Sequence, residues 1–147
     1  MEERFIHYQE SITSLNRAWR TICELEGIKP GTQVWAAAYR MTIIEYCKPF
    51  KKSHGKDKNN HSLPVPEFGQ GMQELHDTLI SLRDTVLAHS DLGPIDAKVV
   101  YGDDHEPFII KNTLPKFPSP SDIKEIIEFV LDDLYGKESE YAPRNEP

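Results

Sequence analysis

Hydrophobic residues recur every three or four positions in four stretches of the chain, and this spacing predicts four α-helices. The first stretch places one apolar seam along a helix that would pack against a partner. Its seam consists of Phe5, Tyr8, Ile12, Leu15, Trp19 and Ile22. Gly27, followed by Pro30 and Gly31, is expected to end this helix because glycine and proline interrupt helical hydrogen bonding.

The second and third stretches differ in how much of their surface is apolar. Residues 32–46 are apolar nearly all round, so we expect them to form the most buried helix, stopped by Pro49. Residues 69–88 alternate apolar and polar positions at the helical step, which predicts an amphipathic helix. The apolar seam of this third helix consists of Met72, Leu75, Leu79, Leu82 and Val86.

The fourth helix is indicated by its start signal. Ser119 can cap the first turn, Pro120 suits the first helical position, and Asp122 suits the positive end of the helix dipole. The apolar face consists of Ile123, Ile126, Ile127, Val130 and Leu134. A chain of 147 residues is about one domain, so the four helices predict an all-α fold, a four-helix up-and-down bundle.

Three other segments complete the expected organisation. Residues 48–68 hold lysine, asparagine, serine, glycine and proline with almost no apolar content, which predicts a flexible basic loop. Residues 95–112 contain two β-rich runs around a Gly-Asp turn, which predicts a small β-hairpin between the third and fourth helices. Residues 137–147 are polar and read as a frayed tail, so the single domain is expected to span residues 1–136.

The charge of the chain limits the classes of partner. A net charge of −7 argues against a general nucleic-acid coat, because that affinity depends on Lys and Arg neutralising phosphates. The stretch from Lys48 to His61 nevertheless holds five lysines against one acidic residue, Asp57. This run permits a local basic patch that includes Lys51 and Lys52, although a solvated lysine-rich loop explains the same residues.

The cysteines and the hydropathy pattern indicate a cytoplasmic protein. No apolar run approaches the roughly 20 residues that cross a bilayer, and the N-terminus lacks the pattern of a secretory signal. Cys23 and Cys47 stand alone within apolar helical patterns, as buried thiols do in a reducing compartment. His89 and Asp91 are at most half of a metal site, and no phosphate-cradling glycine loop is present, so neither a metal nor a cofactor is expected.

Arg83 and His89 are the candidate chemical groups at the end of the third helix. A guanidinium holds a phosphate, and an imidazole exchanges protons near neutral pH, which together suit phosphodiester cleavage without a metal. On a straight helix these side chains lie about 120° apart. They converge only if the helix ends near Ala88 or if a second subunit contributes. A structural histidine that caps the bundle is the alternative for His89.

The string Leu82-Arg83-Asp84-Thr85-Val86-Leu87-Ala88-His89 and the order of the helices resemble the HEPN superfamily of helical nucleotide-binding domains. That family carries Arg-x(4–6)-His at the end of its third core helix. The resemblance implies a metal-independent ribonuclease of toxin or phage-defence type, acting as a homodimer on RNA and paired in some cases with an antitoxin protein. It also implies roles: His89 transfers protons, Arg83 holds the phosphate, and Asp84 orients one of them. Many members keep the fold as a non-catalytic binding or scaffold module, which is the alternative.

Four further residues are candidates for substrate binding. His76 precedes Arg83 by seven residues, so it lies near the same face two turns earlier and could line the same cleft. An exposed histidine on the surface of the helix is the more common explanation for such a residue. Arg40 could add a cation to the cleft, or it could pair with Glu45 at the edge of the bundle. Lys51 and Lys52 would supply cations from the basic loop.

Overall fold

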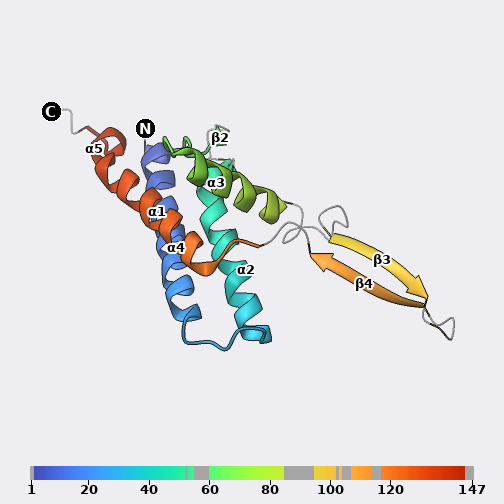
Figure 1. The fold of residues 1–147 in the computed structure, drawn as a ribbon. Coiled ribbons are helices and arrows are strands. Elements are labelled where there is room, and N and C mark those ends of the chain that lie inside the picture. Colours follow the sequence, from blue (N-terminus) through green and yellow to red (C-terminus); the bar gives the residue numbers. More distant parts are fainter. Residues whose placement is uncertain are drawn as a thin grey trace.

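The computed structural model describes residues 2–51, 53–54, 60–84, 95–101, 103, 107–113 and 117–144, and these residues form a mostly helical structure (Figure 1). The helices are α1 (Glu2–Leu25), α2 (Gln33–Cys47), the 3-10 helix η1 (Lys48–Phe50), α3 (Gln70–Leu82), α4 (Pro120–Gly136) and α5 (Glu138–Tyr141). Among them, none is long and apolar enough to cross a membrane.

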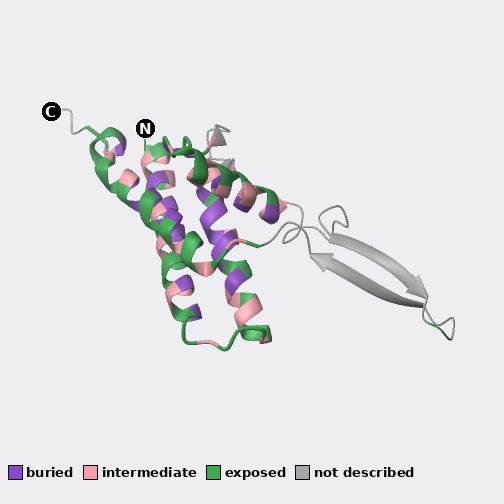
Figure 2. Cartoon of the chain, in the orientation of Figure 1, coloured by how far each residue is buried: buried purple, intermediate pink, exposed green. Residues whose placement is uncertain are grey.

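Helix α1 packs along both α2 and α4, and α3 crosses the bundle close to the C-terminal end of α2 (Figure 1). The core between them is continuous, and Figure 2 shows the buried residues on the facing sides of the helices. Each of the four helices contributes fully buried aliphatic side chains: Leu15, Ile22, Ile43, Leu79, Ile123, Ile126, Ile127 and Val130. Burial of this kind, at about 25 cal/mol per Å² of apolar surface, is the main stabilising contribution to such a fold.

Two predicted helix starts are confirmed. Ser119 caps α4, where its Oγ accepts a hydrogen bond of 3.1 Å from the backbone N–H of Asp122. Thr32 caps α2, where its Oγ1 accepts a bond of 3.2 Å from the backbone N–H of Trp35. The whole predicted apolar face of α4, from Ile123 to Leu134, is buried. Serine and threonine in these positions satisfy N–H groups that the helix itself leaves unpaired.

The predicted seam of α1 is wrong at Trp19, which is 37% exposed. Because α1 faces both α2 and α4, its buried surface is wider than one seam, and Ser11 and Ala18 are buried instead. The Trp19 indole stays at the edge and donates from Nε1 to Oε1 of Glu128 at 3.0 Å.

Burial in α2 is concentrated in its second half. Tyr39, Ile43 and Tyr46 are buried, whereas Val34 is 63% and Met41 is 49% exposed. The prediction of the most buried helix therefore does not extend to Val34 and Met41, which are apolar but face solvent.

The segment between α2 and α3 is better packed than its composition predicts. Strands β1 (Ser53–His54) and β2 (Asn60–His61) pair antiparallel, and residues 62–68 then return along the core. The Leu63 side chain is 5% exposed, and its backbone N–H donates to the Pro49 carbonyl at 2.8 Å. Phe50 and Phe68 also pack against the core. The predicted flexible basic loop is therefore wrong for Phe50, Leu63 and Phe68, whose apolar side chains attach the connection to the core.

The frayed tail predicted for residues 137–147 is wrong for α5. Tyr141 is 7% exposed and stacks on Tyr8 with ring centroids 4.5 Å apart. The Arg4 guanidinium lies over the Tyr141 ring, with its Cζ 4.5 Å from the ring centroid. These contacts join the C-terminal segment to the first turns of α1.

Strands β3 (Ile95–Tyr101) and β4 (Pro107–Thr113) pair antiparallel, with Val99 opposite Ile109. They extend away from the helices (Figure 1). The chain keeps helical backbone angles at Arg83, with φ −60° and ψ −44°. The predicted continuation of the third helix to Ala88 falls within residues 85–94, which lie outside the described residues.

Candidate functional site

Lys51 and Arg83 converge on one carboxylate, that of Asp84. Lys51 follows η1, and its Nζ lies 2.6 Å from Oδ1 and 2.7 Å from Oδ2 of Asp84. The Arg83 guanidinium donates to Oδ1 of the same residue at 3.1 Å. These hydrogen bonds, first from Lys51 and then from Arg83, lower the pKa of Asp84 although partial burial opposes them. We call these three residues the Lys51–Asp84–Arg83 cluster.

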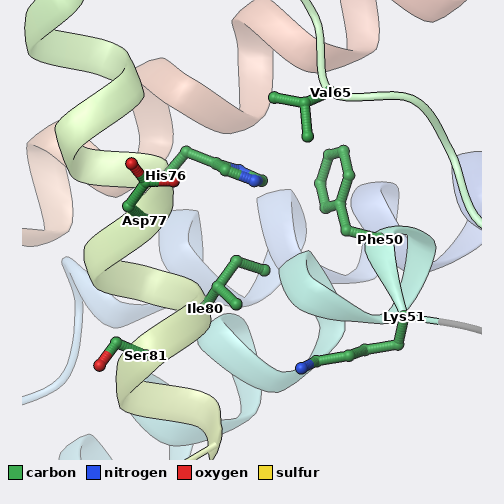
Figure 3. Close-up of a pocket in the computed structure, with 7 residues that line it drawn as sticks. All are labelled: Phe50, Lys51, Val65, His76, Asp77, Ile80 and Ser81. Atoms are coloured by element: carbon green, nitrogen blue, oxygen red, sulfur yellow. The ribbon is translucent and has the colours of Figure 1, made fainter.

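An open pocket of about 320 Å³ adjoins this cluster (Figure 3). Helix α3 forms one wall, and η1 with the segment after β2 forms the other. The lining residues are Phe50, Lys51, Val65, His76, Asp77, Ile80 and Ser81. On α3 the positions of His76, Ile80 and Arg83 follow a step of four and then three residues, which places them along one face of the helix. Arg83, the predicted phosphate-binding residue, therefore follows His76 and Ile80 on the face of the helix that lines the pocket.

His76 is buried, so its interpretation as an exposed surface histidine is wrong. His76 is only 3% exposed, and its Nδ1 lies 2.7 Å from the Tyr46 hydroxyl. The ring contacts Phe50, at 4.7 Å between centroids, and Phe68, at 5.3 Å. Burial lowers the pKa of His76 and raises that of Tyr46, so both groups are neutral near pH 7.

The structure brings together Lys51, His76, Arg83 and Asp84 and leaves Arg40 apart. Arg40 is exposed on α2 and does not line the pocket. The predicted pairing of Arg40 with Glu45 is also wrong, because Lys48 makes the ion pair with Glu45, at 2.7 Å between Nζ and Oε1. His89 and Lys52 lie outside the described residues. Their predicted roles stay predictions.

Several residues of this site were not anticipated from the sequence. Tyr46, Phe50 and Val65 come from other elements than α3, and the helical period of α3 carries no signal for them. Asp77 and Ser81 could have been found, because they precede Asp84 by seven and three residues and share its side of the helix.

Cys47 lies behind the cluster. Its thiol donates to the Leu79 carbonyl at 3.5 Å, and burial raises its pKa to about 12, although the cations of Arg83 and Lys51 act in the opposite direction. A thiol of this kind stays protonated at neutral pH and is a poor nucleophile. Within the described part of the chain no group of three His, Cys, Asp or Glu side chains is placed to hold a metal ion.

Comparison with known proteins adds no relative. No protein-family model matches the chain, and neither the curated proteins nor the solved structures compared with it give a match.

The geometry of the cluster suits an anion more than a neutral ligand. Two cations face one carboxylate, so the Lys51–Asp84–Arg83 cluster carries a formal charge of +1 on an otherwise acidic protein, while the Asp77 carboxylate lines the pocket beside it. Arg83 keeps donors beyond the one that it gives to Asp84, because a guanidinium has five N–H groups in a planar fork. Such a fork can bind two oxygens of a phosphate at once.

Proposed function

We propose that this chain is a metal-independent endoribonuclease of toxin or phage-defence type, similar to the HEPN superfamily. The observation that carries the proposal is the Lys51–Asp84–Arg83 cluster beside an open pocket. The cluster contains the partly exposed guanidinium of Arg83, and His89 follows six residues later in the sequence. Preorganised cations stabilise the charge that develops on phosphate oxygens during cleavage.

The proposed chemistry is a transesterification at phosphorus. His89 removes the proton of a ribose 2′-hydroxyl, the 2′-oxygen attacks the neighbouring phosphorus, and the bond to the 5′-oxygen breaks. The 5′-oxygen leaves with a proton from a second imidazole, and a 2′,3′-cyclic phosphate remains. Arg83 binds the non-bridging oxygens throughout, with Asp84 fixing the plane of its guanidinium.

Two imidazoles are available if the enzyme is a homodimer. We therefore propose that two subunits pair their motif segments and form one composite Arg/His site. The fold proposed for each subunit is the four-helix up-and-down bundle, with the hairpin inserted between α3 and α4. A cytoplasmic location and control by an antitoxin protein belong to the same proposal.

Cleavage of single-stranded RNA by the purified chain tests this function. Substituting His89→Ala or Arg83→Ala should lower the rate by at least about a hundredfold, the usual contribution of a general acid–base group or of one oxyanion donor. The melting temperature should change little. Arg20→Ala on α1 is the matched control, because Arg20 is exposed and lies outside the pocket. Equal activity in all three variants would contradict the proposal.

A non-catalytic binding or scaffold protein of the same fold is the second candidate. The net charge of −7 and the pI near 5.3 favour it, since they limit the surface that can bind a polyanion. The same experiment separates the two functions. Under the scaffold function, RNA stays intact and His89→Ala chiefly lowers stability, by about 1 kcal/mol or more if the ring is buried and hydrogen-bonded.

A further inference from the structure

The His76 imidazole has one nitrogen engaged in the core and the other directed to the pocket. Nδ1 lies 2.7 Å from the Tyr46 hydroxyl, whereas no described residue hydrogen-bonds to Nε2. Among the described side chains, Oε2 of Glu45 is the polar atom that is both inaccessible to solvent and without a hydrogen-bond partner. Because Nε2 of His76 has no partner either, it must be accessible to solvent. It belongs to a ring that lines the pocket and that points from α3 towards Phe50 (Figure 3).

The tautomer of His76 follows from Tyr46. The Tyr46 side chain is fully buried, and its hydroxyl has no other acceptor among the described residues. A buried O–H without an acceptor costs about 1–3 kcal/mol, so the hydroxyl donates to Nδ1 and the ring carries its hydrogen on Nε2. His76 therefore presents a fixed N–H donor to the pocket.

The rest of the lining complements this donor. Phe50, Val65 and Ile80 supply an apolar wall, and the Asp77 carboxylate, whose Oδ1 accepts a hydrogen bond of 3.1 Å from Nε2 of Gln73, lies at the rim one residue after His76. Lys51 stands at the other end, where it joins the cluster that contains Arg83. A volume of about 320 Å³ is at the lower end of the range for small-molecule sites.

We propose that this pocket binds one unstacked nucleobase of a single-stranded RNA, next to the phosphate held by Arg83. The inference rests on the proposed function and names a base subsite for it. The flat ring packs against Phe50 and Ile80, an acceptor on its edge takes the Nε2–H of His76, and a ring or amino N–H donates to Asp77. Every base presents an apolar face and both kinds of edge group, which makes such a subsite tolerant of sequence.

Titration of the whole chain with mononucleotides tests the subsite without any cleavage. The probes are adenosine 5′-monophosphate, uridine 5′-monophosphate and ribose 5-phosphate, observed through the proton resonances of the His76 ring. Both mononucleotides should shift these resonances in a saturable way, and ribose 5-phosphate should not. Equal shifts from ribose 5-phosphate, or none from either mononucleotide, would overturn the proposal.

A pocket-filling variant provides the second measurement. Val65→Trp places a large ring in the pocket from a position that is 47% exposed and whose side chain points towards Phe50 (Figure 3), and Glu74→Trp places the same ring on the outer surface of α3 as its control. Only Val65→Trp should abolish the shifts and raise the KM for RNA by about tenfold, with kcat preserved, as expected when one stacked base is lost.

The failures of the two proposals are distinguishable. If Arg83-dependent cleavage continues in Val65→Trp with an unchanged KM, the subsite is refuted and the ribonuclease stands. If mononucleotides shift the His76 resonances but no RNA is cut, the ribonuclease is refuted and the base pocket stands.

Discussion

Lys51 and Asp84 lie 33 residues apart in the chain, yet Nζ of the first is 2.6 Å and 2.7 Å from the two carboxylate oxygens of the second. This contact joins the end of η1 to the end of α3. It also holds Lys51 at the mouth of the pocket, because the same side chain lines that space. Since Arg83 shares the carboxylate, any change at Asp84 releases both cations at once.

The first prediction concerns acid stability at Asp84. The folded state lowers the pKa of this carboxyl, so its stabilisation is present above pH 3.8 and is lost as the pH falls below that value. At pH 7, Asp84→Asn should lower the free energy of unfolding by less than about 1 kcal/mol, because both partners of the pair are partly exposed. Urea unfolding at pH 7 and pH 3 measures this, and the difference between variant and wild type should shrink at pH 3.

The control for that experiment is Asp132→Asn on the exposed side of α4. It should leave the free energy of unfolding unchanged at both pH values. A loss at pH 7 that is as large for Asp132→Asn as for Asp84→Asn would show that the Lys51 contact contributes nothing.

The second prediction concerns the pH dependence caused by His76. Burial lowers the pKa of this ring from 6.5, so the unfolded chain binds the proton more readily. Its stabilising contribution is complete above pH 6.5 and is lost as the pH falls from there through the folded pKa. His76→Gln should therefore lose less stability between pH 7.5 and pH 5 than the wild type, as measured by urea unfolding.

His7 limits how much of the slope of stability against pH the His76→Gln variant can remove. Burial and the neighbouring His61 also lower the pKa of His7, which acts in the same direction as His76. The slope should thus be reduced in His76→Gln and reduced further in a variant that also carries His7→Gln. A slope identical to that of the wild type would mean that His76 is not desolvated in solution.

The helices were predictable from the sequence because their signals are local. The cap at Ser119 and the apolar positions of α4 lie within a few turns of each other, so periodicity alone specifies both the start and the buried face. Trp19 shows the limit of that reasoning. The period of α1 puts Trp19 on the apolar seam, but the indole is 37% exposed and binds Glu128 of α4, a contact that the period of α1 cannot indicate.

The site was predictable only in part. Arg83 and Asp84 were found because they belong to a motif in the last turns of one predicted helix, residues 69–88. The burial of His76 was missed because it depends on Tyr46 and Phe50, which reach it from α2 and η1, thirty residues away in the case of Tyr46. Contacts between residues so far apart in the sequence cannot be inferred from the hydrophobic period of one helix.

The third prediction concerns the two thiols. Burial raises the pKa of Cys47 to about 12, whereas Cys23 is only partly buried on α1. Alkylation with iodoacetamide at pH 8, followed by mass spectrometry, should modify Cys23 first and Cys47 only after unfolding in urea, because the thiolate is the reactive form. Modification of Cys47 in the folded chain at a rate equal to that of Cys23 would contradict the packing of α2 against α3.

The last prediction compares two tyrosines near the C-terminus. Tyr141 is 7% exposed and stacks on Tyr8, while Tyr135 is 53% exposed and accepts one hydrogen bond of 3.3 Å from Asn16. Tyr141→Ala should lower the free energy of unfolding by about 3 kcal/mol, the cost of removing a buried aromatic ring, and Tyr135→Ala by less than about 1 kcal/mol. Chemical denaturation with far-UV circular dichroism measures both. If the two variants are equally stable, α5 does not dock on α1 in solution, and the residues after Gly136 form the frayed tail that their composition predicts.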